Sequence, residues 1–137
     1  MSKNIVLCGV GGQGTILASK LISAAAMAQG LLVKSAETIG MAQRGGSVFS
    51  HIRIGEDAVC PMIAKGTADI ILGFEPGETV RMLPYLRQGG LVVVSKRAVM
   101  PVTAALAGSN YNGEEMVTYL RSVVERIMVV DTDKACH

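Results

Sequence analysis

A glycine-dense turn near the N-terminus constrains the fold of this chain more than any other stretch. Ile5–Leu7 is a short apolar run, the turn follows at Cys8–Thr15, and an Ala- and Leu-rich segment extends from Ile16 to Gln29. Such a succession predicts a strand, a loop and a helix in that order. In an α/β fold this unit lets backbone N–H groups and a helix N-terminus approach a phosphate, because the glycines carry no Cβ.

The turn matches the pattern G-x-G-x-x-G at Gly9, Gly11 and Gly14. The pattern is weak alone, since a glycine turn also forms where a helix and a strand simply pack closely. Lys20 lies in the predicted helix Thr15–Gln29 and would face either solvent or a ligand beyond the turn. The residues expected to contact a ligand phosphate are Gly9, Gly11, Gly12, Gln13, Gly14, Thr15 and Lys20.

Further apolar runs alternate with helical segments along the rest of the chain. They predict a three-layer, Rossmann-like α/β fold, with an open, mostly parallel sheet and helices on both faces. Val48–Ile54 departs from this pattern, because its β-formers alternate with polar residues and predict a strand with one face in water. The other predicted strands are Leu31–Val33, Asp69–Phe74, Leu91–Val94 and Ile127–Val130, and further helices are predicted over Glu75–Leu86, which Pro84 could end early, and Gly113–Arg126.

The 137 residues amount to one domain by the usual relation between length and domain number. The chain stops at Asp131–His137, directly after a predicted strand and where a following helix would begin. We therefore expect residues 1–137 to be a single domain that lacks its final αβ portion, either because the C-terminus is truncated or because another chain completes it.

Composition narrows the class of protein. Hydrophobic residues make up 50% of the chain, yet no apolar stretch approaches the ~20 residues of a membrane span, and the N-terminus lacks the plan of a signal peptide. These features predict a cytoplasmic protein whose surplus apolar surface covers an interface with a partner. A net charge of +2 and the absence of Trp argue against a nucleic-acid partner.

The cysteines and one histidine bear on catalysis. Cys8, Cys60 and Cys136 lack C-x-x-C spacing, so we expect no zinc or iron–sulfur site and thiols that are buried or idle. His51 follows Phe49 in the alternating run, with no nucleophile motif nearby. We interpret it as a surface or interface histidine rather than a catalytic base, and no catalytic residue is assigned.

Two further features concern the ligand. Glu37 lies roughly 20 residues past the glycine turn, where a dinucleotide-binding fold places the acid that holds a ribose. By itself this favours a stand-alone NAD(P)- or flavin-dependent oxidoreductase. A polar loop follows in place of a crossover helix, and its Arg44 either is solvated or binds a carboxylate or phosphate. The loop residues considered for a site are Gln43, Arg44, Gly45 and Gly46.

Three motifs now stand together in order, Gly9–Gly14, Glu37 with Gly40–Gly46, and Ser50–Arg53. In this spacing they resemble the gamma-type domain of the 2-oxoacid:ferredoxin oxidoreductases, closest to the small (beta) subunit of the indolepyruvate type. The run Gly73–Pro76 with Glu78 and Arg81 resembles that subunit more than its pyruvate or 2-oxoglutarate relatives. The family's domain continues beyond the position of His137.

The resemblance implies an oxidative decarboxylation, in which a 2-oxoacid and coenzyme A give an acyl-CoA, CO2 and reduced ferredoxin. It assigns the thiamine diphosphate and the 4Fe–4S clusters to a large partner subunit, so the present chain would hold no cofactor alone and would be inactive by itself. It implies that this chain docks on the large subunit, helps bind coenzyme A as co-substrate, and meets ferredoxin through the complex. We expect a homodimer of the isolated chain.

Under this resemblance, Glu37 is tied to the loop Gln43–Gly46 rather than to a ribose. The loop would face the large subunit and the coenzyme A channel, and Lys20 or Arg44 would supply positive charge to the phosphates. Two alternatives stay open. One is the stand-alone NAD(P)- or flavin-binding oxidoreductase, and the other is a structural subunit whose glycine turn binds nothing and serves close packing.

Overall fold

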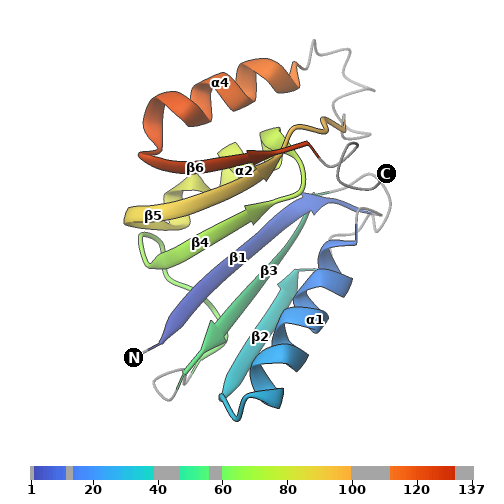
Figure 1. Cartoon of the computed structure of the whole chain (residues 1–137), viewed down its shortest axis with the longest axis vertical. Helices are drawn as coiled ribbons and strands as arrows, with labels where there is room; N and C mark the ends of the chain where they lie inside the picture. The colour runs from blue at the N-terminus through green and yellow to red at the C-terminus, as the bar shows by residue number, and fades with distance from the viewer. Residues whose placement is uncertain (1, 12–13, 39–46, 56–59, 100–111, 132–137) are drawn as a thin grey trace.

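A twisted sheet organises the part of the chain that the computed structural model describes, residues 2–11, 14–38, 47–55, 60–99 and 112–131 (Figure 1). Within these residues the sheet has six strands, and α-helices pack on it. In chain order the elements are β1 (Lys3–Val10), α1 (Thr15–Ala28), β2 (Val33–Thr38), β3 (Ser47–Ile54), β4 (Ala68–Gly73), α2 (Pro76–Met82), a 3-10 turn (Leu83–Tyr85), β5 (Leu86–Ser95), α4 (Gly113–Val123) and β6 (Arg126–Val130).

The strand order is β2-β3-β1-β4-β5-β6. β1, β4, β5 and β6 pair in parallel, whereas β3 runs antiparallel to both of its neighbours, β1 and β2. The prediction of an open, mostly parallel sheet is therefore confirmed, with one antiparallel strand. In a dinucleotide-binding fold the second strand pairs directly with the first. Here β3 separates β2 from β1, and this insertion affects the residues of the candidate site.

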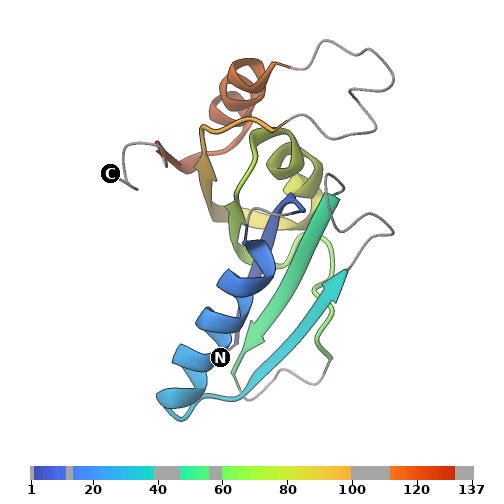
Figure 2. The ribbon, with the colours of Figure 1, turned by 90° about the vertical axis from the view of Figure 1, so that its right-hand side faces the viewer.

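Helices cover both faces of the sheet, as predicted. Figure 2 shows α1 on one side of the strands and α2 on the other. α1 packs on β1, β2 and β3, while α2 packs on β1, β4 and β5 and also against α4. The main core lies on the α2 and α4 side and contains Val6, Cys8, Ile63, Ala68, Ile71, Val92, Val94, Leu120 and Val124.

Capping explains where α2 and α4 begin. The Glu75 side chain accepts a hydrogen bond from the N–H of Glu78, and Pro76 occupies the first turn of α2. The Asn112 side chain accepts from the N–H of Glu114 at the start of α4. Pro84 ends the α2 region in a 3-10 turn, before the predicted end at Leu86. Across the described residues, no helix has both the length and the apolar character needed to cross a bilayer.

Two predicted boundaries were wrong. The second strand was expected at Leu31–Val33, but β2 spans Val33–Thr38, because its register is set by antiparallel pairing with β3. A strand was expected at Leu91–Val94, but β5 spans Leu86–Ser95 and begins where the preceding helix was predicted to end. Pairing with neighbouring strands, rather than local sequence, decided both boundaries.

The prediction that Val48–Ile54 has one wet face was also wrong. β3 lies between β1 and β2, and its central residues Ser50, His51 and Ile52 are all buried. α1 packs over one face of β3, and Tyr85 and Ile63 contact His51 on the other. The alternation of polar and apolar residues therefore marks two covered faces of different polarity.

Candidate functional site

The glycine turn lies at the carboxyl end of β1, the edge at which open α/β sheets bind ligands. Gly9 is part of β1 itself, where it pairs with Val48 of β3, and Gly11 lies in the turn that follows. Gly14 precedes α1 with a φ of 86°, a left-handed conformation that favours glycine. Gly12 and Gln13 lie outside the described residues.

The N-terminus of α1 carries no capping side chain. No acidic residue lies in its first turn, and the Gly14 carbonyl accepts from the N–H of Ala18 at 2.9 Å. Thr15, the first helical residue, is 3% exposed, and its Oγ1 has no hydrogen-bond partner. The N-terminus of α1 thus combines the positive end of the helix dipole with a buried Thr15 hydroxyl that has no hydrogen-bond partner.

The N-terminus of α2 is filled by the protein's own carboxylate. Glu75 is 1% exposed; its Oε1 accepts from the N–H of Glu78 at 3.0 Å and its Oε2 accepts from the N–H of Val99 at 3.1 Å. The first turn of α4 likewise carries two acidic residues, Glu114 and Glu115. Among the α-helices of the described segments, α1 therefore offers the open N-terminus.

A hydrogen-bonded cluster ties α2 to the start of β3. Ser47 Oγ donates to Glu78 Oε1 at 2.9 Å, and Arg81 Nη1 donates to Ser47 Oγ at 2.9 Å. Arg81 also lies 3.5 Å from the nearly buried Glu78 carboxylate. Because Ser47 pairs with Val10, the cluster lies at the same edge as the glycine turn. The sequence prediction assigned this cluster no role, although the spacing of Glu75, Pro76 and Glu78 is that of a helix cap.

Cys8 lies beneath this cluster and is inert. Its thiol is buried and lies 3.9 Å from Thr79 Oγ1. Burial, together with the charges of Glu78 and Glu75, raises the pKa of Cys8 to about 12. The thiol therefore stays protonated at neutral pH, which confirms the expectation of a buried, idle cysteine. Cys60 is exposed, and Cys136 lies outside the described residues.

His51 is not the surface or interface histidine that the sequence predicted. It is 1% exposed, and its Nδ1 accepts a hydrogen bond from the Ile63 N–H at 2.9 Å. The rings of Phe49 and Tyr85 lie 5.4 Å and 5.3 Å from the imidazole. Burial lowers its pKa, so the ring is neutral. The prediction failed because both faces of β3 are covered, by α1 on one side and by Tyr85 and Ile63 on the other.

The remaining predicted site residues are dispersed. Glu37 lies in β2, and Ser50 of β3 stands between it and Leu7 of β1 in the register. It is thus two strands from β1, roughly 10 Å away. Lys20 is exposed on the second turn of α1. Gln43, Arg44, Gly45 and Gly46 lie outside the described residues.

A shallow pocket of about 460 Å³ lies elsewhere, between the start of β5 and the end of α4. Leu86, Arg87, Tyr119 and Val123 line part of it. The amino ends of the parallel strands lie at this edge, opposite to the glycine turn, so the pocket is separate from the candidate site. Within the described segments, no three His, Cys, Asp or Glu side chains gather as they would around a metal ion.

Residues 4–132 match the model of the pyruvate ferredoxin/flavodoxin oxidoreductase family. The chain belongs to this family. The indolepyruvate oxidoreductase subunit IorB of Archaeoglobus fulgidus is 42% identical over 135 residues, which are 98% of this chain and 67% of that protein. The recognition of a gamma-type domain similar to the indolepyruvate small subunit is therefore confirmed.

Two solved structures share the fold. The pyruvate oxidoreductase subunit PORC of Thermotoga maritima superposes with a TM-score of 0.62 at 22% identity, over 95% of this chain and 62% of that one. The 2-oxoglutarate:ferredoxin oxidoreductase of Magnetococcus marinus, solved with 2-oxoglutarate, coenzyme A and succinyl-CoA bound, superposes with a TM-score of 0.64 at 20% identity, over 95% of this chain and 19% of that one. The chain thus spans about two thirds of the small subunits that it resembles.

Proposed function

We propose that this chain is the small subunit of an indolepyruvate-type 2-oxoacid:ferredoxin oxidoreductase and that it helps to bind coenzyme A. Membership of the family and the 42% identity to an IorB subunit support the subunit role. The observation that carries the ligand-binding role is the open N-terminus of α1, where Thr15 Oγ1 is buried without a partner.

The phosphates of coenzyme A would meet backbone donors at this turn. Gly11, Gly12, Gln13 and Gly14 supply N–H groups, and the helix dipole adds the equivalent of roughly half a positive charge. Side chains of a helix lean toward its N-terminus, so Lys20 in the second turn is suited to reach the phosphates. Thr15 Oγ1 would then donate the hydrogen bond that it lacks in the free chain.

The loop Gln43–Gly46 forms the second part of the proposed site, with Arg44 as its cation and Glu37 tied to it. Ser47, the first described residue after this loop, pairs with Val10 at the edge that also carries the glycine turn. The bonds of Ser47 to Glu78 and Arg81 hold the start of β3 in place. In this proposal the loop faces the large subunit and the coenzyme A channel.

The redox chemistry would belong to the large subunit, whose thiamine diphosphate decarboxylates the 2-oxoacid and whose 4Fe–4S clusters pass electrons to ferredoxin. Cys8, the thiol beneath the candidate site, is protonated and buried and so is not a reactive nucleophile. The chain alone, mixed with indolepyruvate, coenzyme A and a dye acceptor, is therefore expected to be inactive. Turnover by the chain alone would contradict this division of labour.

Thr15→Val tests the coenzyme A site. Valine keeps the shape of threonine but lacks the hydroxyl, which has no partner in the free chain. We expect unchanged or slightly higher stability, because an unsatisfied buried hydroxyl is lost. A hydrogen bond to a charged group contributes about 1.5–3 kcal/mol, so coenzyme A should bind roughly 10- to 100-fold more weakly to the assembled enzyme.

Ser23→Ala is the matched control. Ser23 Oγ is also buried without a partner, but it lies two turns further along α1, away from the glycine turn. Its removal should change stability like Thr15→Val and leave the affinity for coenzyme A unaltered. If calorimetry gave wild-type affinity for Thr15→Val, Thr15 would have no part in the site.

The rival nicotinamide or flavin function depends on Glu37 as a ribose ligand. The insertion of β3 places Glu37 two strands from β1, and this speaks against such a role. A ligand at a hundred times its Kd adds about 2.7 kcal/mol of stability. Stabilisation by NADH but not by coenzyme A would favour the rival, and stabilisation by neither in the assembled enzyme would favour a purely structural subunit.

A further inference from the structure

One end of the Arg81 guanidinium group is held by the protein, and the other end is open. Its Nη1 donates to Ser47 Oγ at 2.9 Å and lies 3.5 Å from Glu78 Oε1, whereas no acceptor among the described residues bonds to its Nε or Nη2. The Arg81 side chain is 64% exposed and that of Glu78 only 4%, so the guanidinium lies outside the carboxylate that anchors it. An ion pair with an exposed partner stabilises a fold only slightly, so stability alone does not explain this arrangement.

Two other arginines show the ordinary structural use of this side chain. Nε of Arg87 donates to Asp69 Oδ1 at 2.7 Å. Nε of Arg53 donates to Asn4 Oδ1 at 3.1 Å. Both side chains also donate through Nη1 to backbone carbonyl oxygens, so two donor positions of each serve the fold. Arg81 differs from both, because the edge formed by its Nε and Nη2 makes no such bond within the described part of the chain.

The Arg81 side chain reaches across the end of β1. α2 packs on β1 and β4, yet the guanidinium bonds to Ser47 of β3, which lies on the other side of β1 from β4. Ser47 pairs with Val10, the last residue of β1. The guanidinium therefore lies beside the point at which β1 ends and the glycine turn begins.

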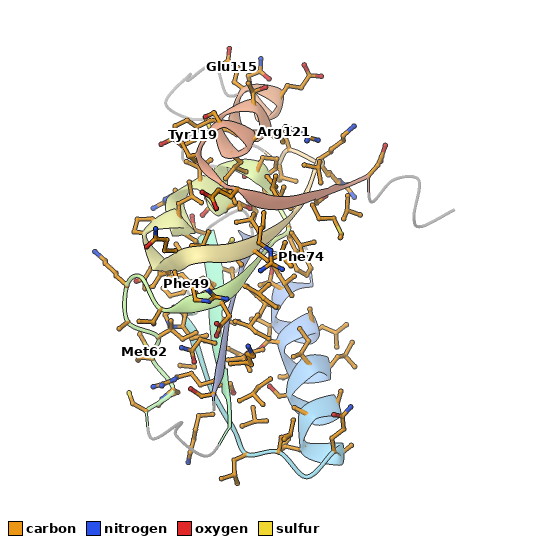
Figure 3. The ribbon with its side chains drawn as sticks, turned by 60° about the vertical axis from the view of Figure 1, so that its left-hand side comes forward. Phe49, Met62, Phe74, Glu115, Tyr119 and Arg121 are labelled. Carbon is orange, nitrogen blue, oxygen red and sulfur yellow. The ribbon has the colours of Figure 1, made fainter. Side chains whose placement is uncertain are left out.

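The strand connections place a ligand crevice at this point. β1 and β4 are parallel neighbours, and they lead to α1 on one face of the sheet and to α2 on the other (Figure 2). Phe74, labelled in Figure 3, follows β4, and its N–H donates to the Cys8 carbonyl at 2.8 Å, so the two strands stay joined until their loops diverge. Open α/β sheets bind ligands where neighbouring strands connect to opposite faces. A ligand here lies between the N-terminus of α1 and the side chains of α2.

We propose that Arg81 binds the 3′-phosphate of coenzyme A while the glycine turn binds the pyrophosphate, an assignment that rests on the function proposed above. A pyrophosphate is met by backbone N–H groups at a helix N-terminus in α/β folds, and α1 offers such an end. The 3′-phosphate is a terminal group on the ribose of the same nucleotide. Its free oxygens suit the two parallel donors Nε and Nη2 of an arginine.

Ser47 and Glu78 prepare Arg81 for this contact. Arginine loses side-chain freedom when a ligand orders it, and two contacts already restrict Arg81 in the free chain. The Glu78 carboxylate would repel a phosphate at close range. Its Oε1 accepts from Ser47 Oγ at 2.9 Å and lies behind the guanidinium, so the charge presented to solvent is that of Arg81.

Binding of 3′-dephospho-coenzyme A to the assembled enzyme tests the assignment, because this ligand keeps the pyrophosphate and lacks the 3′-phosphate. Arg81→Gln removes the charge and keeps a donor for Ser47. By calorimetry, this variant should bind coenzyme A about 10- to 100-fold more weakly than the wild type and bind the dephospho form equally well. The wild-type preference for coenzyme A over the dephospho form should therefore disappear.

Arg97→Gln is the matched control. Arg97 is also an exposed arginine at the carboxyl edge, but it follows β5, two strands from β1. Its removal should leave the preference for coenzyme A unchanged, with the same circular dichroism spectrum as Arg81→Gln. An equal loss in both variants would reveal a general attraction between charges and would overturn the assignment to Arg81.

Thr15→Val separates this assignment from the proposed function. It should weaken both ligands equally, because both carry the pyrophosphate. If it did so while Arg81→Gln kept the wild-type preference, Arg81 would have no part in a coenzyme A site that still stands. A wild-type enzyme that binds neither ligand would overturn both proposals. Dissociation of Arg81→Gln from the large subunit in sedimentation would identify an acidic side chain of that subunit as the anion and would overturn the assignment.

Discussion

Acidification should destabilise the fold through a single buried imidazole, that of His51. In the folded chain His51 is 1% exposed, and its Nδ1 accepts from the Ile63 N–H. Burial lowers its pKa from the ordinary value of 6.5, so the unfolded chain takes up a proton near pH 6.5 while the folded chain does not. The free energy of unfolding therefore begins to fall below pH 6.5 and continues to fall until the pH reaches the lowered pKa of the folded state.

The magnitude follows from proton linkage. A histidine that titrates at pH 6.5 when unfolded and stays neutral when folded lowers the free energy of unfolding by about 2 kcal/mol between pH 7.5 and pH 5.0. This is the upper bound, because protonation of folded His51 would end the loss. Protonation of His51 would also turn Nδ1, the acceptor of the Ile63 N–H, into a donor. We therefore expect the chain to open locally around Ile63 when the folded His51 is protonated.

Urea unfolding at pH 7.5, 6.5 and 5.0 measures the effect. His51→Gln is the matched variant, since its amide oxygen can accept from the Ile63 N–H but does not titrate. The wild type should lose up to about 2 kcal/mol more than the variant over this range, while the contributions of other titrating groups cancel in the difference. Parallel pH profiles for the two proteins would refute the assignment of His51 as a buried neutral base.

Two further predictions concern the packing of α2 on β4 and the buried thiol. A Cβ at Gly73 would overlap the Thr79 side chain, so Gly73→Ala should cost roughly 1–3 kcal/mol in urea unfolding; wild-type stability would show that α2 moves away freely. The Cys60→Ser, Cys136→Ser variant should resist a thiol reagent at pH 8 until it unfolds, because burial raises the pKa of Cys8 to about 12. Rapid labelling of that variant in the folded state would show that Cys8 is accessible.

Local sequence predicted the helices better than the strands. α1 was placed within one residue, because a glycine turn and a run of helix formers act on neighbouring residues. The early end at Pro84 follows from the missing N–H and the fixed φ of proline. β2 was misplaced, since its residues Lys34, Ser35 and Glu37 are polar and become a strand only by pairing with β3.

The sequence placed some of the candidate-site residues near one another, and their role in binding stays a prediction. Gly9, Gly11, Gly14 and Thr15 lie at the carboxyl end of β1 and the start of α1 because they are close in the chain. The position of Glu37 in the sequence matched that of a ribose-binding acid, but β3 separates it from β1, and strand order is encoded by no local motif. The cluster of Ser47, Glu78 and Arg81 joins residues 31 or more positions apart, so it became visible only in the folded chain.

By itself, the sequence determined the α/β class, the turn that opens α1 and the family to which the chain belongs, because these depend on motifs of neighbouring residues. Tertiary structure decided the insertion of β3, the burial of His51 and the hydrogen-bonded cluster of Ser47, Glu78 and Arg81. Strand order and burial depend on contacts between distant segments. A single hydrophobic pattern is compatible with several such arrangements, and packing selects one of them.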